Sequence, residues 1–91
     1  MLTRTAALEL AEHGITVVGV GPGAVATAMN KATMSDSDKR QKLQSTIPLS
    51  RMARPAEIAN LVAWLASGQA NYVTATTYFI DGGIMQFSPG L

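Results

Sequence analysis

The residues of this chain that could contact a small molecule are gathered in one short loop, Pro22-Gly23-x-Val25-x-Thr27. The loop follows an apolar run that predicts a strand, and parallel sheets bind ligands at the carboxyl ends of their strands. A Pro-Gly turn frees backbone groups that can hydrogen-bond a carboxamide, and the Thr27 hydroxyl can both donate and accept. On residue types alone an ordinary strand-to-loop turn is the simpler interpretation, so ligand contact and plain turn both stand as hypotheses.

Other polar side chains each have a structural interpretation beside the chemical one. Asp81 could be a general base, but Asp-Gly-Gly is typical of a turn. His13 lies at the end of a predicted helix, where it complements the helix dipole or is simply exposed. Arg51 and Arg54 could bind a phosphate or could flank a helix start as solvated charges. We name no catalytic residue and expect no metal site, because the chain has no cysteine and one histidine.

Composition restricts the classes of partner. The chain has 91 residues, 47% of them hydrophobic and 14% charged, which fits one small globular domain at most. A formal charge of +1 gives no basis for nucleic-acid or anionic-membrane partners, because both require clustered positive charge. The longest apolar run, around Ile15 to Val20, is too short to span a bilayer, and no secretory signal is recognisable. We expect a cytoplasmic chain with neither nucleic-acid nor membrane partners.

The first half of the chain predicts a helix followed by a strand. Residues 1–13 are rich in strong helix formers, and Gly14 suits a left-handed cap at the helix end. The run from Ile15 to Val20 is β-branched and lacks polar alternation, which predicts a strand buried on both faces. Gly21-Pro22-Gly23 should end that strand and open a loop.

The second half predicts two helices and a second strand. A short polar helix should run to about Ser45, with Ser35 and Asp38 in capping-box spacing at its start. A stronger helix should begin at Pro55, which tolerates the first helical position, and should stop at Gly68. The large aromatic side chains are expected in the core or at a subunit interface: Trp64, Tyr72, Tyr78 and Phe79.

The second strand is predicted at residues 76–80, and it should form a right-handed parallel crossover with the first through the intervening helix. Two strands that are apolar on both faces need neighbouring strands and helices on both sides. The chain supplies about two strands and two long helices, fewer than a free-standing doubly wound sheet has. We therefore predict a single partial α/β domain over residues 1–91, incomplete as a stand-alone unit.

An ordered set of short motifs resembles the short-chain dehydrogenase/reductase family, and specifically the C-terminal third of such an enzyme. The motifs are Leu2-Thr3-Arg4, Glu9-Leu10-Ala11, His13-Gly14-Ile15, Pro22 to Thr27, Ile47-Pro48-Leu49, Arg54-Pro55, Glu57-Ile58-Ala59, Leu65-Ala66-Ser67, Tyr72-Val73-Thr74 and Asp81-Gly82-Gly83. Within the family, the details most resemble the glucose 1-dehydrogenase group: Gly21 to Val25, Met29-Asn30, Trp64 to Ser67 and Asp81 to Gln86. The resemblance implies the C-terminal portion of a Rossmann-like doubly wound parallel sheet.

The resemblance also implies a partial NAD or NADP site. Pro22, Gly23, Val25 and Thr27 match the element that binds the nicotinamide end of the cofactor, which favours ligand contact over a plain turn. The segment 28–46 resembles the variable substrate lid. Met29 and Asn30 are its candidate substrate contacts. The implied substrate of the complete enzyme is a small alcohol or sugar. Tetramers are common in the family, and the expected homo-oligomer interface involves residues 1–13, 55–67 and 76–81.

The family's catalytic Tyr-x-x-x-Lys pair and glycine-rich fingerprint have no counterpart here, since neither Tyr72 nor Tyr78 has a lysine four residues later. We expect a C-terminal segment of an NAD(P)-dependent oxidoreductase acting on a CH–OH or carbonyl group, inactive by itself. The alternatives are a non-catalytic fragment that docks on full-length relatives and a truncated reading frame. Ala53 and Ala75 stand where the family usually has glycine. A positive φ at either position would cost about 1 kcal/mol.

Overall fold

A computed structural model describes residues 1–27 and 35–86 of the chain. Helix α1 (Leu2–Leu10) runs on into a 3₁₀ turn (Ala11–His13) and is followed by strand β1 (Val18–Pro22). The remaining elements are helix α3 (Ser37–Ser45), helix α4 (Pro55–Leu65), a 3₁₀ turn (Gly68–Ala70), strand β2 (Thr76–Ile80) and a 3₁₀ turn (Ile84–Gln86). In the described ranges, no helix is both long and apolar enough to cross a membrane.

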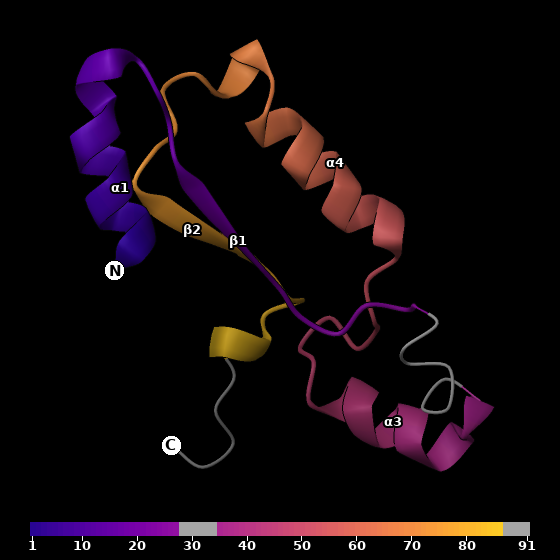
Figure 1. Ribbon diagram of the computed structural model, residues 1–91. Helices are drawn as coiled ribbons and strands as arrows, with labels where there is room; N and C mark the ends of the chain where they lie inside the picture. Colours follow the sequence, from indigo (N-terminus) through magenta and orange to yellow (C-terminus); the bar gives the residue numbers. More distant parts are fainter. Residues whose placement is uncertain (28–34, 87–91) are drawn as a thin grey trace.

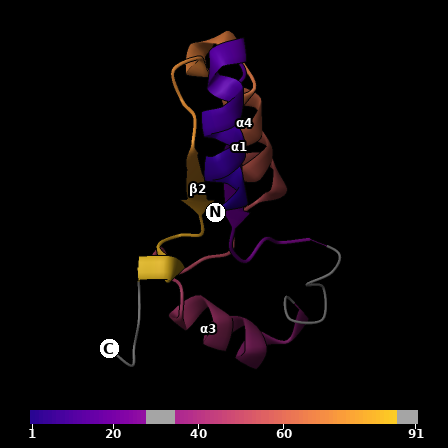
Figure 2. The same cartoon turned by 60° about the vertical axis from the view of Figure 1, so that its left-hand side comes forward.

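The two strands pair in parallel, from Val18 opposite Thr76 to Pro22 opposite Ile80. The chain passes between them through α4, and α1 and α4 lie on opposite sides of the strand pair (Figure 1). Helix α3 lies beyond the carboxyl ends of the strands, away from the other two helices (Figures 1 and 2). This arrangement confirms the predicted α/β class with a parallel sheet.

Strand β1 is displaced along the chain from its predicted position at Ile15 to Val20. At its start, Val17 N donates to the Thr74 side chain at 3.0 Å, and its carbonyl accepts from Ala75 N at 2.9 Å. At its end, Gly23 N donates to Ile80 O at 3.1 Å. Since alternate residues of a strand face the same neighbour, Pro22 turns its nitrogen away from β2 and its missing N–H breaks no bond. The Gly-Pro-Gly punctuation was therefore a wrong indicator of where the strand ends.

Two of the helix limits predicted from single residues are confirmed, and a third is wrong. Gly14 adopts the predicted left-handed cap, with φ 72°, and Pro55 is the first residue of α4. Gly68 does not end α4 as predicted. The cap is Ala66, in right-handed conformation, and Ser67 Oγ donates to Trp64 O at 2.6 Å. The Ser67 hydroxyl thus hydrogen-bonds a carbonyl at the end of the helix, and the helix ends without a glycine in the left-handed conformation.

Helix α3 is capped within the run Ser35 to Asp38, in which every side chain offers an N-cap oxygen. Asp36 is its N-cap, and Asp36 Oδ1 accepts from Asp38 N at 3.0 Å and from Lys39 N at 3.1 Å. The capping box expected between Ser35 and Asp38 was wrong. A carboxylate satisfies two of the free amides at the start of the helix, and its charge suits the positive end of the dipole.

The core of the described residues is small. Its buried apolar members are Ala7, Ile47, Met52 and Ala70. The four aromatic side chains expected in the core or at an interface are all exposed, from 38% for Tyr78 to 102% for Tyr72. The radius of gyration is 16.1 Å, against roughly 12 Å for a compact domain of this length. Two strands leave most sheet-facing side chains without neighbours, so the core interpretation of the aromatics was wrong for this chain.

Ala75 has φ 64°, whereas Ala53 is not among the described residues with positive φ. We expect Ala75→Gly to raise the free energy of unfolding by about 1 kcal/mol, because glycine removes the steric cost of the left-handed conformation. Ala53→Gly is the matched control, and it should lower stability by about 0.5–1 kcal/mol through added unfolded-state freedom. Urea midpoints of both variants measure the difference. Equal shifts in the same direction would contradict the assignment of strain to Ala75.

Candidate functional site

The carboxyl ends of β1 and β2 place the loop 23–27 against the turn that begins at Asp81. The backbones approach so closely that a Cβ built on Gly23 would lie 2.9 Å from the Asp81 Cα and 2.8 Å from its Cβ. A real Cβ essentially never makes contacts this short, so the packing requires glycine here. The sequence-predicted loop residue Gly23 is therefore fixed by its approach to the second strand.

A second attachment ties the same loop to the segment before α4. Val25 and Ala53 form a parallel bridge, in which Ala26 N donates to Ala53 O and Ala53 N donates to Ala24 O, both at 2.9 Å. Thr27 N donates to Val25 O at 2.9 Å. The amides of residues 23, 26 and 27 thus have partners within the chain. Ala53 was missed by the sequence analysis as a neighbour of the loop, since the bonds are made by its backbone and its methyl side chain does not indicate them.

These bonds narrow the expectation that the Pro-Gly turn frees backbone groups for a ligand, because the amides of residues 23, 26 and 27 are already used within the chain. What the loop keeps is acceptor capacity, because each carbonyl oxygen has two lone pairs. Thr27 is exposed, so its hydroxyl can donate or accept. A carboxamide NH₂ donates, which matches carbonyl acceptors held in a rigid loop. Carbonyl acceptors and the exposed Thr27 hydroxyl are groups that can hydrogen-bond a carboxamide such as the one at the nicotinamide end of NAD(P). Met29 and Asn30 lie outside the described residues.

A pocket of about 70 Å³ lies beside the loop. It is lined by Ala24, Leu49, Arg51, Ala53, Glu57, Ile80, Asp81 and Gly82. Ligand sites for drug-sized molecules usually measure roughly 300–1,000 Å³. This pocket is too small to enclose a cofactor, so further walls of any such site must come from outside these residues.

Asp81, which lines the same pocket, is a turn residue. Its Oδ1 accepts from Gly83 N at 2.9 Å and its Oδ2 accepts from Met85 N at 3.1 Å. Both oxygens are engaged with backbone amides, and Gly82 and Gly83 have φ of 66° and 97°. This confirms the turn interpretation over the general base. His13 is not among the residues that line this pocket. Its exposed side chain places Nε2 3.4 Å from the Glu12 carboxylate, which is also exposed.

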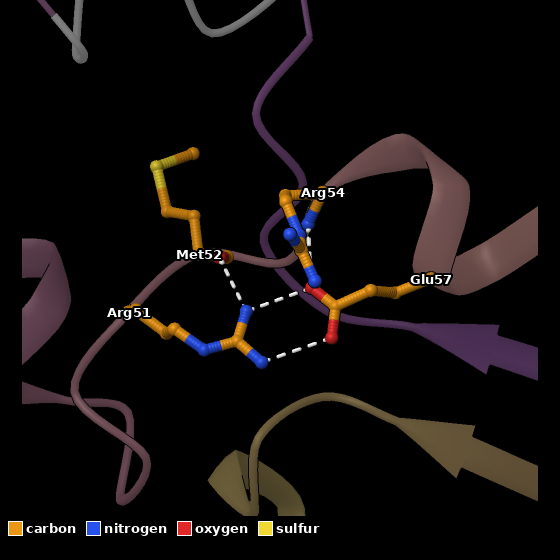
Figure 3. A network of polar contacts seen from close by, with 4 residues as sticks. All are labelled: Arg51, Met52, Arg54 and Glu57. Atoms are coloured by element: carbon orange, nitrogen blue, oxygen red, sulfur yellow. Dashed lines mark hydrogen bonds and ion pairs between the residues drawn. The ribbon is translucent and has the colours of Figure 1, made fainter.

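Glu57 is the centre of a polar network before α4 (Figure 3). Arg51 Nη1 donates to Glu57 Oε1 at 2.7 Å and Arg51 Nη2 donates to Oε2 at 2.9 Å, a two-bond fork. Arg54 N donates to Oε1 at 2.9 Å. The Arg51 hydrogen bonds, and next the Arg54 amide, lower the pKa of Glu57 to about 2. Arg51 thus pairs with a carboxylate while its side chain stays 51% exposed. It flanks the start of α4 as predicted, and the sequence analysis missed its partner Glu57.

Glu57→Gln should change how stability depends on pH. A carboxyl whose pKa is lowered on folding stabilises the folded state above its ordinary pKa of 4.5, and this contribution disappears as pH falls towards about 2. We expect wild type to lose stability relative to Glu57→Gln across that window. Urea midpoints over a pH series measure it, with Glu9→Gln on the exposed side of α1 as the charge-matched control. Parallel pH curves for wild type and Glu57→Gln would contradict the lowered pKa.

A family model described as Enoyl-(Acyl carrier protein) reductase matches residues 1–85. The chain belongs to the short-chain dehydrogenase/reductase family. It is 46% identical over 90 residues to 3beta-hydroxysteroid dehydrogenase 1 of Eggerthella lenta, covering 99% of this chain and 34% of that protein. It is 43% identical over 84 residues to Glucose 1-dehydrogenase 2 of Bacillus subtilis, covering 92% of this chain and 32% of that protein.

Among solved structures, 4-hydroxyisoleucine dehydrogenase complexed with NADH superimposes with a TM-score of 0.90 at 26% identity, over 96% of this chain and 36% of that one. This short-chain dehydrogenase/reductase segment spans about a third of the length of the curated relatives it matches. The relatives include steroid and glucose dehydrogenases. They support the family and single out no group within it. The solved structures of family members with NADH and with NADP support NAD(P) as the cofactor of the family.

Proposed function

We propose that this chain is a segment of an NAD(P)-dependent oxidoreductase that acts on a CH–OH or carbonyl group. The observation that carries the proposal is the rigid loop 23–27, held at the carboxyl ends of two parallel strands in a chain matched by the family over residues 1–85. Pro22 and Gly23 shape the loop, while Val25 and Thr27 contact the nicotinamide end of the cofactor. NAD(P), when bound, exchanges a hydride with the substrate carbon.

The part of this chain in the reaction is to bind and orient. No side chain here is assigned as the proton donor, because neither tyrosine has a lysine four residues later and proton transfer needs a positioned acid or base. The segment 28–46 forms the substrate lid, with Met29 and Asn30 as its contacts and α3 as its helical part. We infer that the 91-residue chain alone does not turn over substrate.

The substrate is proposed to be a small alcohol or sugar, with a glucose 1-dehydrogenase-like enzyme as the finer hypothesis. The support is the resemblance of Gly21 to Val25 and Asp81 to Gln86 to that group, together with the 43% identity to Glucose 1-dehydrogenase 2. No residue of this segment distinguishes NAD from NADP. A cytoplasmic location fits these substrates.

A chimera tests the proposal directly. The segment of Eggerthella lenta 3beta-hydroxysteroid dehydrogenase 1 that aligns with this chain is replaced by the 91 residues, and NAD(P)H absorbance reports activity. We expect the chimera to turn over substrate and Thr27→Val to raise the KM for the cofactor about tenfold, because the hydroxyl is lost at an exposed contact. Thr5→Val, on α1, is the control. An active chimera whose cofactor KM is indifferent to Thr27→Val would contradict the assigned contact.

The second candidate function is a non-catalytic fragment that docks on full-length relatives. It is favoured by large apolar side chains left exposed on three elements: Leu2 at 83%, Leu8 at 64%, Val62 at 47%, Trp64 at 41% and Phe79 at 55%. The same elements, 1–13, 55–67 and 76–81, are the proposed homo-oligomer interface. Size-exclusion chromatography with and without a full-length relative separates the two. Co-elution without any gain of activity supports docking, and independent elution argues against it.

A further inference from the structure

We propose that the Arg51–Glu57 ion pair is a positioning clamp for the loop 23–27. The clamp acts through Ala53, the residue that bonds the loop and lies between the two attachment points of the Glu57 carboxylate. The inference rests on the proposed function only in assigning the cofactor to that loop. Arg51 and Glu57 are positioning residues, because their contacts reach the loop only through the backbone of Ala53.

The contacts form a closed bracket around Ala53. On one side, the Arg51 guanidinium makes its two-bond fork with Glu57, and Arg51 Nη1 also donates to Met52 O at 3.3 Å. On the other side, Arg54 N donates to Glu57 Oε1 at 2.9 Å. One carboxylate at the start of α4 therefore fixes the chain both before and after Ala53 (Figure 3).

Fixing Ala53 fixes the loop because both backbone groups of Ala53 bond to it. Ala53 N donates to Ala24 O, and Ala53 O accepts from Ala26 N. Met52, which lies next to Ala53 in the same bracket, is buried, with 8% exposed. Fork geometry matters here, because a planar guanidinium holds a carboxylate in one orientation while an ammonium acts as a point charge.

The pair is suited to local positioning and poorly suited to holding the fold together. The Arg51 side chain is 51% exposed and the Glu57 side chain 28% exposed, and exposed ion pairs contribute little to overall stability. Loss of the pair should therefore open the bracket without unfolding α4. This separation between local and global opening is what an experiment can detect.

Residue-resolved amide hydrogen exchange on the 91-residue chain tests the clamp without any cofactor. In Arg51→Gln the amides of Ala26 and Ala53 should exchange about tenfold faster, while amides in the middle of α4 keep wild-type rates. Arg54→Gln is the matched control: it removes the same charge from a neighbouring side chain, 78% exposed and with Nε 3.5 Å from Glu57 Oε1. Its Ala26 and Ala53 amides should stay within about twofold of wild type.

Two further variants identify what the pair contributes. Arg51→Lys keeps the charge but not the fork, so protection at Ala26 and Ala53 should fall between wild type and Arg51→Gln. Glu57→Gln should lose at least as much protection as Arg51→Gln, because it removes the charge that holds both the fork and the bond from Arg54 N. The double variant should add little to Glu57→Gln, because the fork is already broken in both single variants. Equal exchange in Arg51→Gln and Arg54→Gln, or full protection in Arg51→Gln, would overturn the proposal.

If Arg51→Gln also accelerates α4, raised salt in wild type provides the second measurement, since it screens an exposed pair. Faster exchange confined to Ala26 and Ala53 supports the clamp, and unchanged exchange overturns it. Cofactor binding is measured separately in the chimera, where Arg51→Gln should raise the cofactor KM more than it lowers kcat. If exchange shows the clamp but the chimera binds no cofactor, the proposed function is refuted. The proposal of the clamp is then unaffected.

Discussion

Gly82→Ala is expected to lower the free energy of unfolding by about 2–4 kcal/mol, because the added methyl group meets both a backbone and a packing penalty. Gly82 has φ 66°, so alanine there pays for a left-handed conformation. Its Cβ would also lie 2.6 Å from the Ile47 Cγ2 atom. That methyl is branched from the Ile47 Cβ, and Ile47 is only 3% exposed. The contact therefore cannot be relieved by the swing of a flexible side-chain end.

Gly14→Ala separates the two causes of this effect. Gly14 has φ 72°, but a Cβ built on it meets nothing within 4 Å. It should cost about 1 kcal/mol, the backbone contribution alone. The difference between the urea midpoints of the two variants then measures the Ile47 contact. If both variants lose the same stability, the contact between the added methyl group and Ile47 costs nothing, and the expected packing penalty at Gly82 would be wrong.

The parts of the fold that were predictable depend on short-range chemistry. Pro55 at a helix start, Gly14 at a helix end and the turn at Asp81 were predicted, because each is determined by the conformational limits or hydrogen bonding of one residue and its near neighbours. The strand at Thr76–Ile80 was predicted at its observed bounds. Local sequence is sufficient where local geometry is the cause.

The parts that failed depend on partners distant in sequence. The bounds of β1 are set by β2, which lies 58 residues further on in the ladder that pairs Val18 with Thr76. The aromatic side chains were expected to be covered because their neighbours were assumed to be present. Arg51 was interpreted without Glu57, although an arginine six residues before a glutamate at a helix start can reach it.

The candidate site shows the same division. Residues 22–27 were located from a Pro-Gly turn after an apolar run, and the loop does lie at the carboxyl ends of parallel strands. Its hydrogen bonds to Ala53 were not predictable, since backbone pairing across 28 residues leaves no trace in side-chain type. The sequence predicted backbone groups free for a ligand without saying which, and hydrogen bonds within the chain use the amides of residues 23, 26 and 27, which limits the ligand groups that the loop can recognise.

Gly23→Ala should therefore damage the site more than any change of an exposed loop side chain. A Cβ at residue 23 meets backbone, the Asp81 Cα at 2.9 Å, and backbone cannot rotate away. We expect a loss of about 1–3 kcal/mol in the free energy of unfolding, because the two strand ends must separate to admit the methyl. The Gly23 N to Ile80 O bond, 3.1 Å in the wild type, should lengthen or break.

Gly68→Ala is the control, since its Cβ would meet only the Asn71 side chain at 3.9 Å. It should leave stability within about 0.5 kcal/mol of wild type, as ordinary surface substitutions do. Amide exchange distinguishes a local from a general effect: the Gly23 and Ala26 amides should lose protection in Gly23→Ala and keep it in Gly68→Ala. In the chimera, the same displacement should raise the cofactor KM, because the carbonyls proposed to face nicotinamide move with the loop. Retained protection at Gly23 and Ala26 would show that the loop tolerates a side chain, and the requirement for glycine at the site would fall.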